Sequence, residues 1–206
     1  MKSAFLAIAL PCFAGSTFAA PEEHGITGLK AIPLPGTVNE VADFTPDGRH
    51  AIIAKAYGNN DWVYLVMVQP QPRSPSGDNG WNVVFRRNGE GQLVETITDS
   101  PHTGEDYVRS VVFACGKIDG TDSTLLITAE RRIEGPIPDP AVVTYSVYRL
   151  EHDGGAYAGD IEIFRPVQIW DSTEKYCNSD FAMTAEFGLP LPVNAGYLSL
   201  PDGCMR

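Results

Sequence analysis

The 206-residue sequence is poor in basic side chains and in cysteine, and it has no long apolar run. Its 15 Lys and Arg residues are outnumbered by 26 Asp and Glu residues, for a formal net charge of -11. Nucleic acids and anionic membranes are bound through basic surface, so neither is expected as a partner. No stretch approaches the ~20 apolar residues of a membrane-spanning helix, so no membrane span is expected either.

The sequence also lacks the motifs of the common enzyme classes. Its four histidines are isolated and do not have the spacing of a zinc site. It contains no G-x-S-x-G, P-loop or G-x-G-x-x-G motif. Ser172 and Lys175 match S-x-x-K, but no K-T-G strand follows, as the penicillin-recognising enzymes require. We therefore expect no catalytic residue and no enzyme.

The first 20 residues are typical of a signal peptide. Lys2 supplies the positive start, residues 4–10 form a short apolar region, and Thr17-Phe18-Ala19 is a small-x-small cleavage signal. Cleavage is predicted after Ala19 or Ala20, which makes residues 1–20 a removed signal peptide. Residues 21–206 are long enough for one core, so we expect a single β-rich domain in the periplasm or secreted.

Cleavage leaves three cysteines, an odd number, in an oxidising compartment where one disulfide and one thiol are expected. Pairing Cys177 with Cys204 closes the shortest loop and is favoured by loop-closure entropy. Pairing Cys115 with Cys177 is the alternative. Cys115 ends an apolar run, so a buried, unreactive thiol is expected there.

Short β-branched and aromatic runs alternate with turn residues along the mature chain. They predict four hairpins, formed by residues 51–57 with 62–68, 81–87 with 92–98, 108–115 with 123–130, and 141–150 with 161–170. We expect an all-β fold, an antiparallel β-sandwich or small open barrel of about eight strands. One short C-terminal helix is predicted over residues 181–187, capped by residues 178–180 and ended by Gly188.

One loop resembles a metal site. Asp43, Thr45 and Asp47 place oxygen atoms at alternate positions before Gly48, as in the first half of a calcium loop, so calcium is the one cofactor suggested. The simpler interpretation is a Pro-Asp-Gly β-turn that leads into a strand. This interpretation is favoured because the acid expected further along the loop is missing.

A second candidate is a polar binding patch. Glu130 and Arg131 lie at a strand end beside the proline-rich segment 135–140, and Asn59 and Asn60 form the turn of the first hairpin. These four residues are the candidate binding patch for a small molecule or a protein. Surface ion pairing of Glu130 with its neighbours is the simpler alternative.

Several segments together resemble the CarG-like carbapenem self-resistance proteins. The resemblance extends from about residue 28 to 190 and rests on residues 43–53, 59–60, 125–131, 140–150 and 176–189. It implies a small periplasmic β-rich protein, associated with tolerance to carbapenem antibiotics, for which no lactam-cleaving residues are established.

The sequence thus predicts a non-enzymatic periplasmic binding or protective protein. Its partner is an unidentified small molecule or envelope protein. Two alternatives remain open at this point: an interaction module of an envelope complex, and a hydrolase that uses paired acids on polysaccharide or peptidoglycan.

Overall fold

A computed structural model describes residues 19–58, 61–70, 80–87, 92–94, 96–101, 107–136, 139–153 and 161–189. Within them are two helices, α1 (Ala19–Glu23) and α2 (Ser179–Phe187). The strands are β1 (Ile26–Ala31), β2 (Val38–Val41), β3 (Ala51–Gly58), β4 (Asp61–Val68), β5 (Asn82–Arg87), β6 (Leu93–Val94), β7 (Thr96–Pro101), β8 (Tyr107–Ile118), β9 (Thr121–Arg131), β10 (Ala141–Asp153) and β11 (Ile161–Tyr176).

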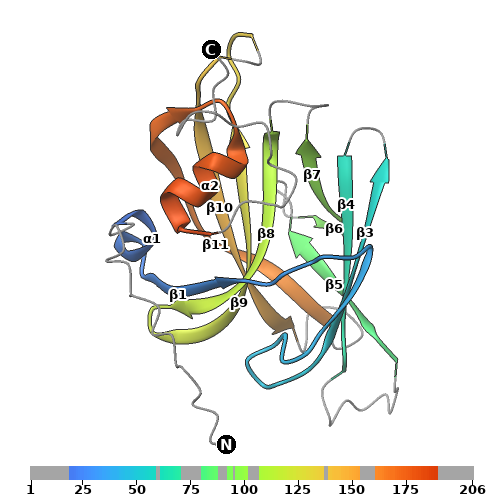
Figure 1. The fold of residues 1–206 in the computed structure, drawn as a ribbon. Coiled ribbons are helices and arrows are strands. Elements are labelled where there is room, and N and C mark those ends of the chain that lie inside the picture. Colours follow the sequence, from blue (N-terminus) through green and yellow to red (C-terminus); the bar gives the residue numbers. More distant parts are fainter. Residues whose placement is uncertain are drawn as a thin grey trace, which may run out of the picture.

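All eleven described strands join one sheet, which curls into a half-barrel (Figure 1). The strand order is β2-β3-β4-β7-β8-β9-β10-β11-β5-β6, and β1 pairs with the distal part of β8. The pairs are antiparallel except β5 with β11, which is parallel. The all-β prediction is therefore confirmed. The two-sheet sandwich and the number of about eight strands are corrected, because short strands join one continuous sheet.

The sheet is buried on both faces along the middle of β9. On β9, Leu125 and Ile127 face a core shared with α2 and β1, whereas Leu126 between them faces a second core with β3 and β4. This follows from the alternation of side chains along a strand. Figure 1 shows both helices on the same side of the sheet, and α2 contributes Ala182, Met183 and Phe187 to the first core. The second core fills the curl of the sheet.

Three of the four predicted hairpins form as expected, between β3 and β4, β8 and β9, and β10 and β11. The hairpin predicted from residues 81–98 is only partly right. β5 pairs with β6 through two residue pairs, and β7 then leaves to pair with β4 and β8. No local sequence pattern predicts this pairing of β7, because its partner strand β4 is distant along the chain.

The predicted C-terminal helix is confirmed as α2. The Asn178 side chain caps it, and its Oδ1 accepts hydrogen bonds from the backbone N–H groups of Asp180 and Phe181. Gly188 ends it in the left-handed conformation and donates its N–H to the carbonyl of Thr184. Neither described helix is long and apolar enough to cross a membrane.

Candidate functional site

The segment from Asp43 to Arg49 forms a tight turn, as the simpler interpretation predicted. Asp43 and Gly48 both adopt positive φ, and the Gly48 N–H donates to the carbonyl of Thr45 at 2.9 Å. The Thr124 hydroxyl on β9 donates to the carbonyl of Phe44, whose side chain is fully buried in the second core. The turn is therefore attached firmly to the sheet.

Two of the three predicted calcium ligands, Thr45 and Asp47, are engaged within the turn itself. The Thr45 hydroxyl donates to the Asp47 carboxylate and accepts the backbone N–H of Arg49. The Arg49 Nε donates to both Asp47 oxygens at 3.0 Å. A calcium ion at Asp43, Thr45 and Asp47 would have to displace that guanidinium, so the geometry favours the turn interpretation.

Among the described residues, no group of three or more His, Cys, Asp or Glu side chains is placed to hold a metal ion. The predicted loop supplies only two carboxylates, and one of them is neutralised by Arg49. Hard cations such as calcium prefer six to eight oxygen ligands. Calcium binding stays a prediction that this arrangement does not favour.

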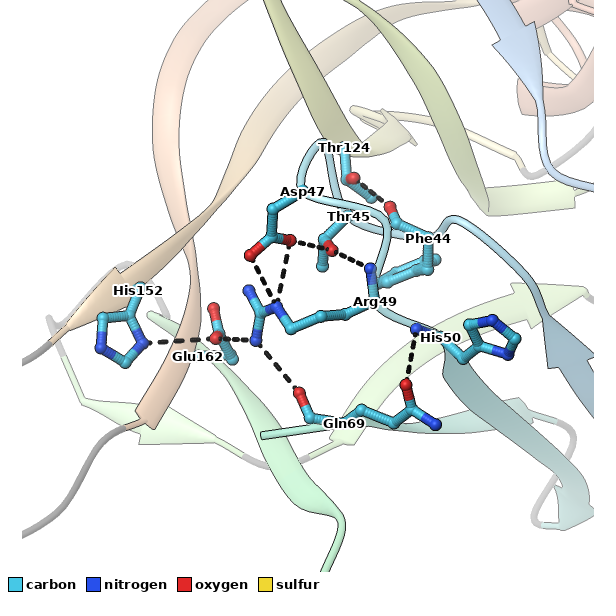
Figure 2. A network of polar contacts seen from close by, with 9 residues as sticks. All are labelled: Phe44, Thr45, Asp47, Arg49, His50, Gln69, Thr124, His152 and Glu162. Atoms are coloured by element: carbon cyan, nitrogen blue, oxygen red, sulfur yellow. Dashed lines mark hydrogen bonds and ion pairs between the residues drawn. The ribbon is translucent and has the colours of Figure 1, made fainter. Parts of the chain in front are cut away.

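Arg49 connects the turn to a buried glutamate (Figure 2). Its Nη1 lies 2.5 Å from Glu162 Oε1 and 3.1 Å from the carbonyl of Gln69, and His152 Nδ1 lies 3.3 Å from the same glutamate oxygen. The Glu162 side chain is only 2% exposed. A carboxylate buried so deeply needs compensating charge, which Arg49 supplies.

Within this network, Asp47 and Arg49 favour each other's ionised forms. Burial alone would raise the pKa of Asp47, but hydrogen bonds from Thr45 and Arg49 and the charge of Arg49 bring it below its ordinary value. Burial likewise opposes ionisation of Arg49, yet Glu162 and Asp47 raise its pKa. We refer to these contacts, which come from four segments of the chain, as the Arg49 clamp.

The other side of the turn borders a groove of about 640 Å³. The turn forms one wall, and β1 with the β8–β9 hairpin forms the rest. The lining residues are Gly28, Lys30, Asp43, Phe44, Thr45, Pro46, Gly48, Cys115, Gly116, Lys117, Asp122, Ser123 and Thr124. Its volume lies within the roughly 300 to 1,000 Å³ typical of small-molecule sites.

A bulge in β1 shapes the groove. The pairing of β1 with β8 skips between Thr27 and Lys30, and Gly28 within the bulge has φ of 63°. A Cβ built on Gly28 would have no other atom within 4 Å, so Gly28 borders open space. Lys30 is thereby paired with Cys115 of β8 and lines the groove.

Cys115 is a free, exposed thiol in the groove, so the expectation that it is buried was wrong. On β8, Ala114 and Ile118 face the first core, whereas Cys115 points to the opposite face of the sheet and lines the groove. Partial burial raises the pKa of the thiol, and the neighbouring Lys30 opposes that shift without cancelling it. A thiol with a raised pKa is protonated at neutral pH and is a poor nucleophile.

Because Cys115 is free, the alternative disulfide of Cys115 with Cys177 does not form. Cys115 pairs with Thr124 at one end of β9, whereas Cys177 follows β11 beside Arg131 at the other end. Seven strand positions correspond to roughly 20 Å, far beyond the Cα separation of a disulfide. Cys204 lies outside the described residues, so its pairing with Cys177 stays a prediction.

The proposed patch of Glu130 and Arg131 does not form one surface. Adjacent residues of β9 point to opposite faces, so Glu130 is exposed and pairs with Arg109 at 2.7 Å, whereas Arg131 is 3% exposed. Arg131 donates to the carbonyls of Tyr176 and Asp139, which holds the proline-rich segment. The predicted patch residues Asn59 and Asn60 lie outside the described residues.

Ser172 of the S-x-x-K match has a structural role. Its hydroxyl accepts the N–H of Val143 at 2.9 Å and donates to the carbonyl of Glu174 at 2.6 Å. These bonds lie where the register between β10 and β11 shifts. The hydroxyl thus forms hydrogen bonds with the backbone at this irregularity in the strand pairing.

Sequence reasoning missed Lys30, Lys117, Asp122 and Glu162. Asp119-Gly120 is a type I′ hairpin signal, and extending its register outward would have placed Lys117 opposite Asp122. The other two had no local signal. Lys30 depends on the bulge in β1, and Glu162 depends on Arg49, which is 113 positions away.

Comparison with known proteins gives one informative result. No family model and no curated protein matches the sequence. The crystal structure of CarG superposes with a TM-score of 0.57 at 16% identity, over 75% of this chain and 94% of that chain. The fold is distantly similar to that of CarG. At this identity the CarG comparison concerns the fold alone.

Proposed function

We propose that this chain is an exported, non-enzymatic binding protein that resembles carbapenem self-resistance factors, and that the groove beside the 43–48 turn holds its ligand. The groove carries the proposal. It combines a volume suited to a small molecule with walls attached to the sheet through Phe44 and Arg49. The signal peptide predicted for residues 1–20 and the CarG-like fold support an envelope role.

The rigidity of the groove also favours binding. Ligand sites are usually formed before the ligand arrives, because ordering a loop on binding costs free energy. Here the turn is fixed by the bond from Thr124 and by the Arg49 clamp, and the opposite wall is a continuous hairpin. Little reorganisation is needed for a small molecule to enter.

The test uses tolerance of a sensitive host to a carbapenem. Expression of the wild-type chain should raise the inhibitory concentration. Cys115→Trp, which adds an indole to the groove without changing its charge, should abolish the increase. Ile169→Trp is the matched control, because Ile169 is 71% exposed on β11 and does not line the groove.

Other outcomes distinguish the alternatives. Unchanged tolerance with wild-type protein present in the periplasm would contradict a protective role. Loss of intact carbapenem on incubation with purified protein would identify a hydrolase, for which Asp43 and Asp122 in the groove are the available carboxylates. Co-purification of one stoichiometric envelope protein, with no drug binding, would favour the interaction module.

A further inference from the structure

Two acidic and two basic side chains line the groove, but only one acidic and one basic side chain form an ion pair with each other. Lys117 Nζ lies 3.7 Å from Asp122 Oδ1, across the register of the β8–β9 hairpin. Among the described residues, neither Lys30 nor Asp43 forms an ion pair or a side-chain hydrogen bond. The groove therefore presents one unmatched positive charge and one unmatched negative charge.

These two charges are on different walls. Lys30 projects from β1 after the bulge, at the position paired with Cys115. Asp43 begins the turn and adopts a left-handed conformation with φ of 51°. The next residue, Phe44, is fixed by its buried side chain and by Thr124. The backbone positions of both charges are thus set before any ligand binds.

We propose that the groove binds a zwitterionic small molecule, with its carboxylate on Lys30 and its ammonium group on Asp43. The inference rests on the proposed function of the groove as a ligand site and adds the chemical class of the ligand. A molecule with a single charge would leave one of the two residues unmatched. Charge-assisted hydrogen bonds are stronger than neutral ones, so both groups contribute to selectivity.

The experiment measures binding of four forms of one carbapenem that carries a free amine and a carboxylate. The forms are the parent molecule, its carboxylate ester, its N-acetyl derivative, and the doubly blocked molecule. Isothermal titration of the mature protein should rank the parent first. Each blocked charge should weaken binding about tenfold, which corresponds to ~1.4 kcal/mol.

Two variants assign the contacts. Lys30→Gln should bind the parent and the ester equally well but still prefer the free amine. Asp43→Asn should show the converse, and asparagine tolerates the left-handed conformation of this position. Lys175→Gln and Asp119→Asn are matched controls, since neither residue lines the groove and Asp119 also has a positive φ. Both should keep the wild-type ranking.

The outcomes separate the two proposals. Equal binding of all four forms would overturn the zwitterion inference and leave the groove as a ligand site. If Lys30→Gln and Asp43→Asn kept the wild-type ranking, the inference would also be overturned, because residues other than Lys30 and Asp43 would then bind the carboxylate and ammonium groups of the ligand. Absence of binding by every form would contradict the proposed function and this inference together.

Discussion

The interaction between Arg49 and Glu162 shows most clearly how single residues hold the candidate site. Removing one partner of a buried ion pair leaves the other charge uncompensated, which costs about 3 to 5 kcal/mol. Arg49→Met should therefore lower the free energy of unfolding by about 3 kcal/mol in urea denaturation. Glu162→Gln in the same chain should restore part of the loss, because the stranded carboxylate is removed.

A loss below about 1 kcal/mol in Arg49→Met would show that Glu162 is not held by this pair. Lys175→Met is a suitable control, because Lys175 is exposed and its removal strands no buried charge. It should change the free energy of unfolding by less than about 0.5 kcal/mol.

Asp180 makes a separate prediction about pH. Burial raises its pKa to about 6 from 3.8, against the hydrogen bond from Ser110, and its Oδ2 has no partner in the described structure. The folded state therefore binds the proton more tightly than the unfolded state. The resulting stabilisation is present at low pH and is lost as pH rises from about 4 through about 6.

Asp180→Asn removes this titration. The stability of the wild type relative to Asp180→Asn should fall by about 2 to 3 kcal/mol between pH 4 and pH 7, measured by urea denaturation across that range. A difference between the two proteins that is independent of pH would show that Asp180 keeps an ordinary pKa when folded.

At the scale of elements, local signals correctly predicted three of the four hairpins and helix α2. Asp119 and Gly120 both have positive φ, as a type I′ turn requires, and Asn178 and Gly188 form the expected caps. Each of these signals acts over a few residues. β1, β2 and the parallel pair of β5 with β11 were missed, because a short strand is stabilised by a neighbour that is distant in sequence.

The cap of α2 should contribute measurably to stability. Asn178→Ala removes the acceptor of two backbone N–H groups at a buried helix end, so it should destabilise the fold by about 1 kcal/mol. Asn178→Ser should recover most of that loss, since serine also caps helices. Equal stability of all three proteins in thermal unfolding would contradict the assigned cap.

At the scale of the whole molecule, the sequence predicted one β-rich domain but not how its sheet closes. The continuous apolar run Leu125-Leu126-Ile127 is buried on both faces of β9. The curl of the sheet, and with it the groove, depends on long-range pairing and on the β1 bulge. Composition alone could therefore predict the class of fold but not the site.

Cysteine chemistry offers a whole-molecule prediction. If Cys177 pairs with Cys204, titration of the folded mature protein with excess thiol reagent should detect one accessible thiol, that of Cys115. Cys115→Ser should contain none, and reduction in denaturant should release three in the wild type. Three thiols without reduction would exclude the predicted disulfide.

The most direct test of the account is to map ligand contacts on the whole protein. Nuclear magnetic resonance of the isotope-labelled mature domain, titrated with the amine-bearing carbapenem, should shift amide signals of residues 28–30, 43–48 and 115–124 while the drug stays intact. Shifts confined to another surface, or no shifts at millimolar drug, would contradict the assignment of this groove as the ligand site.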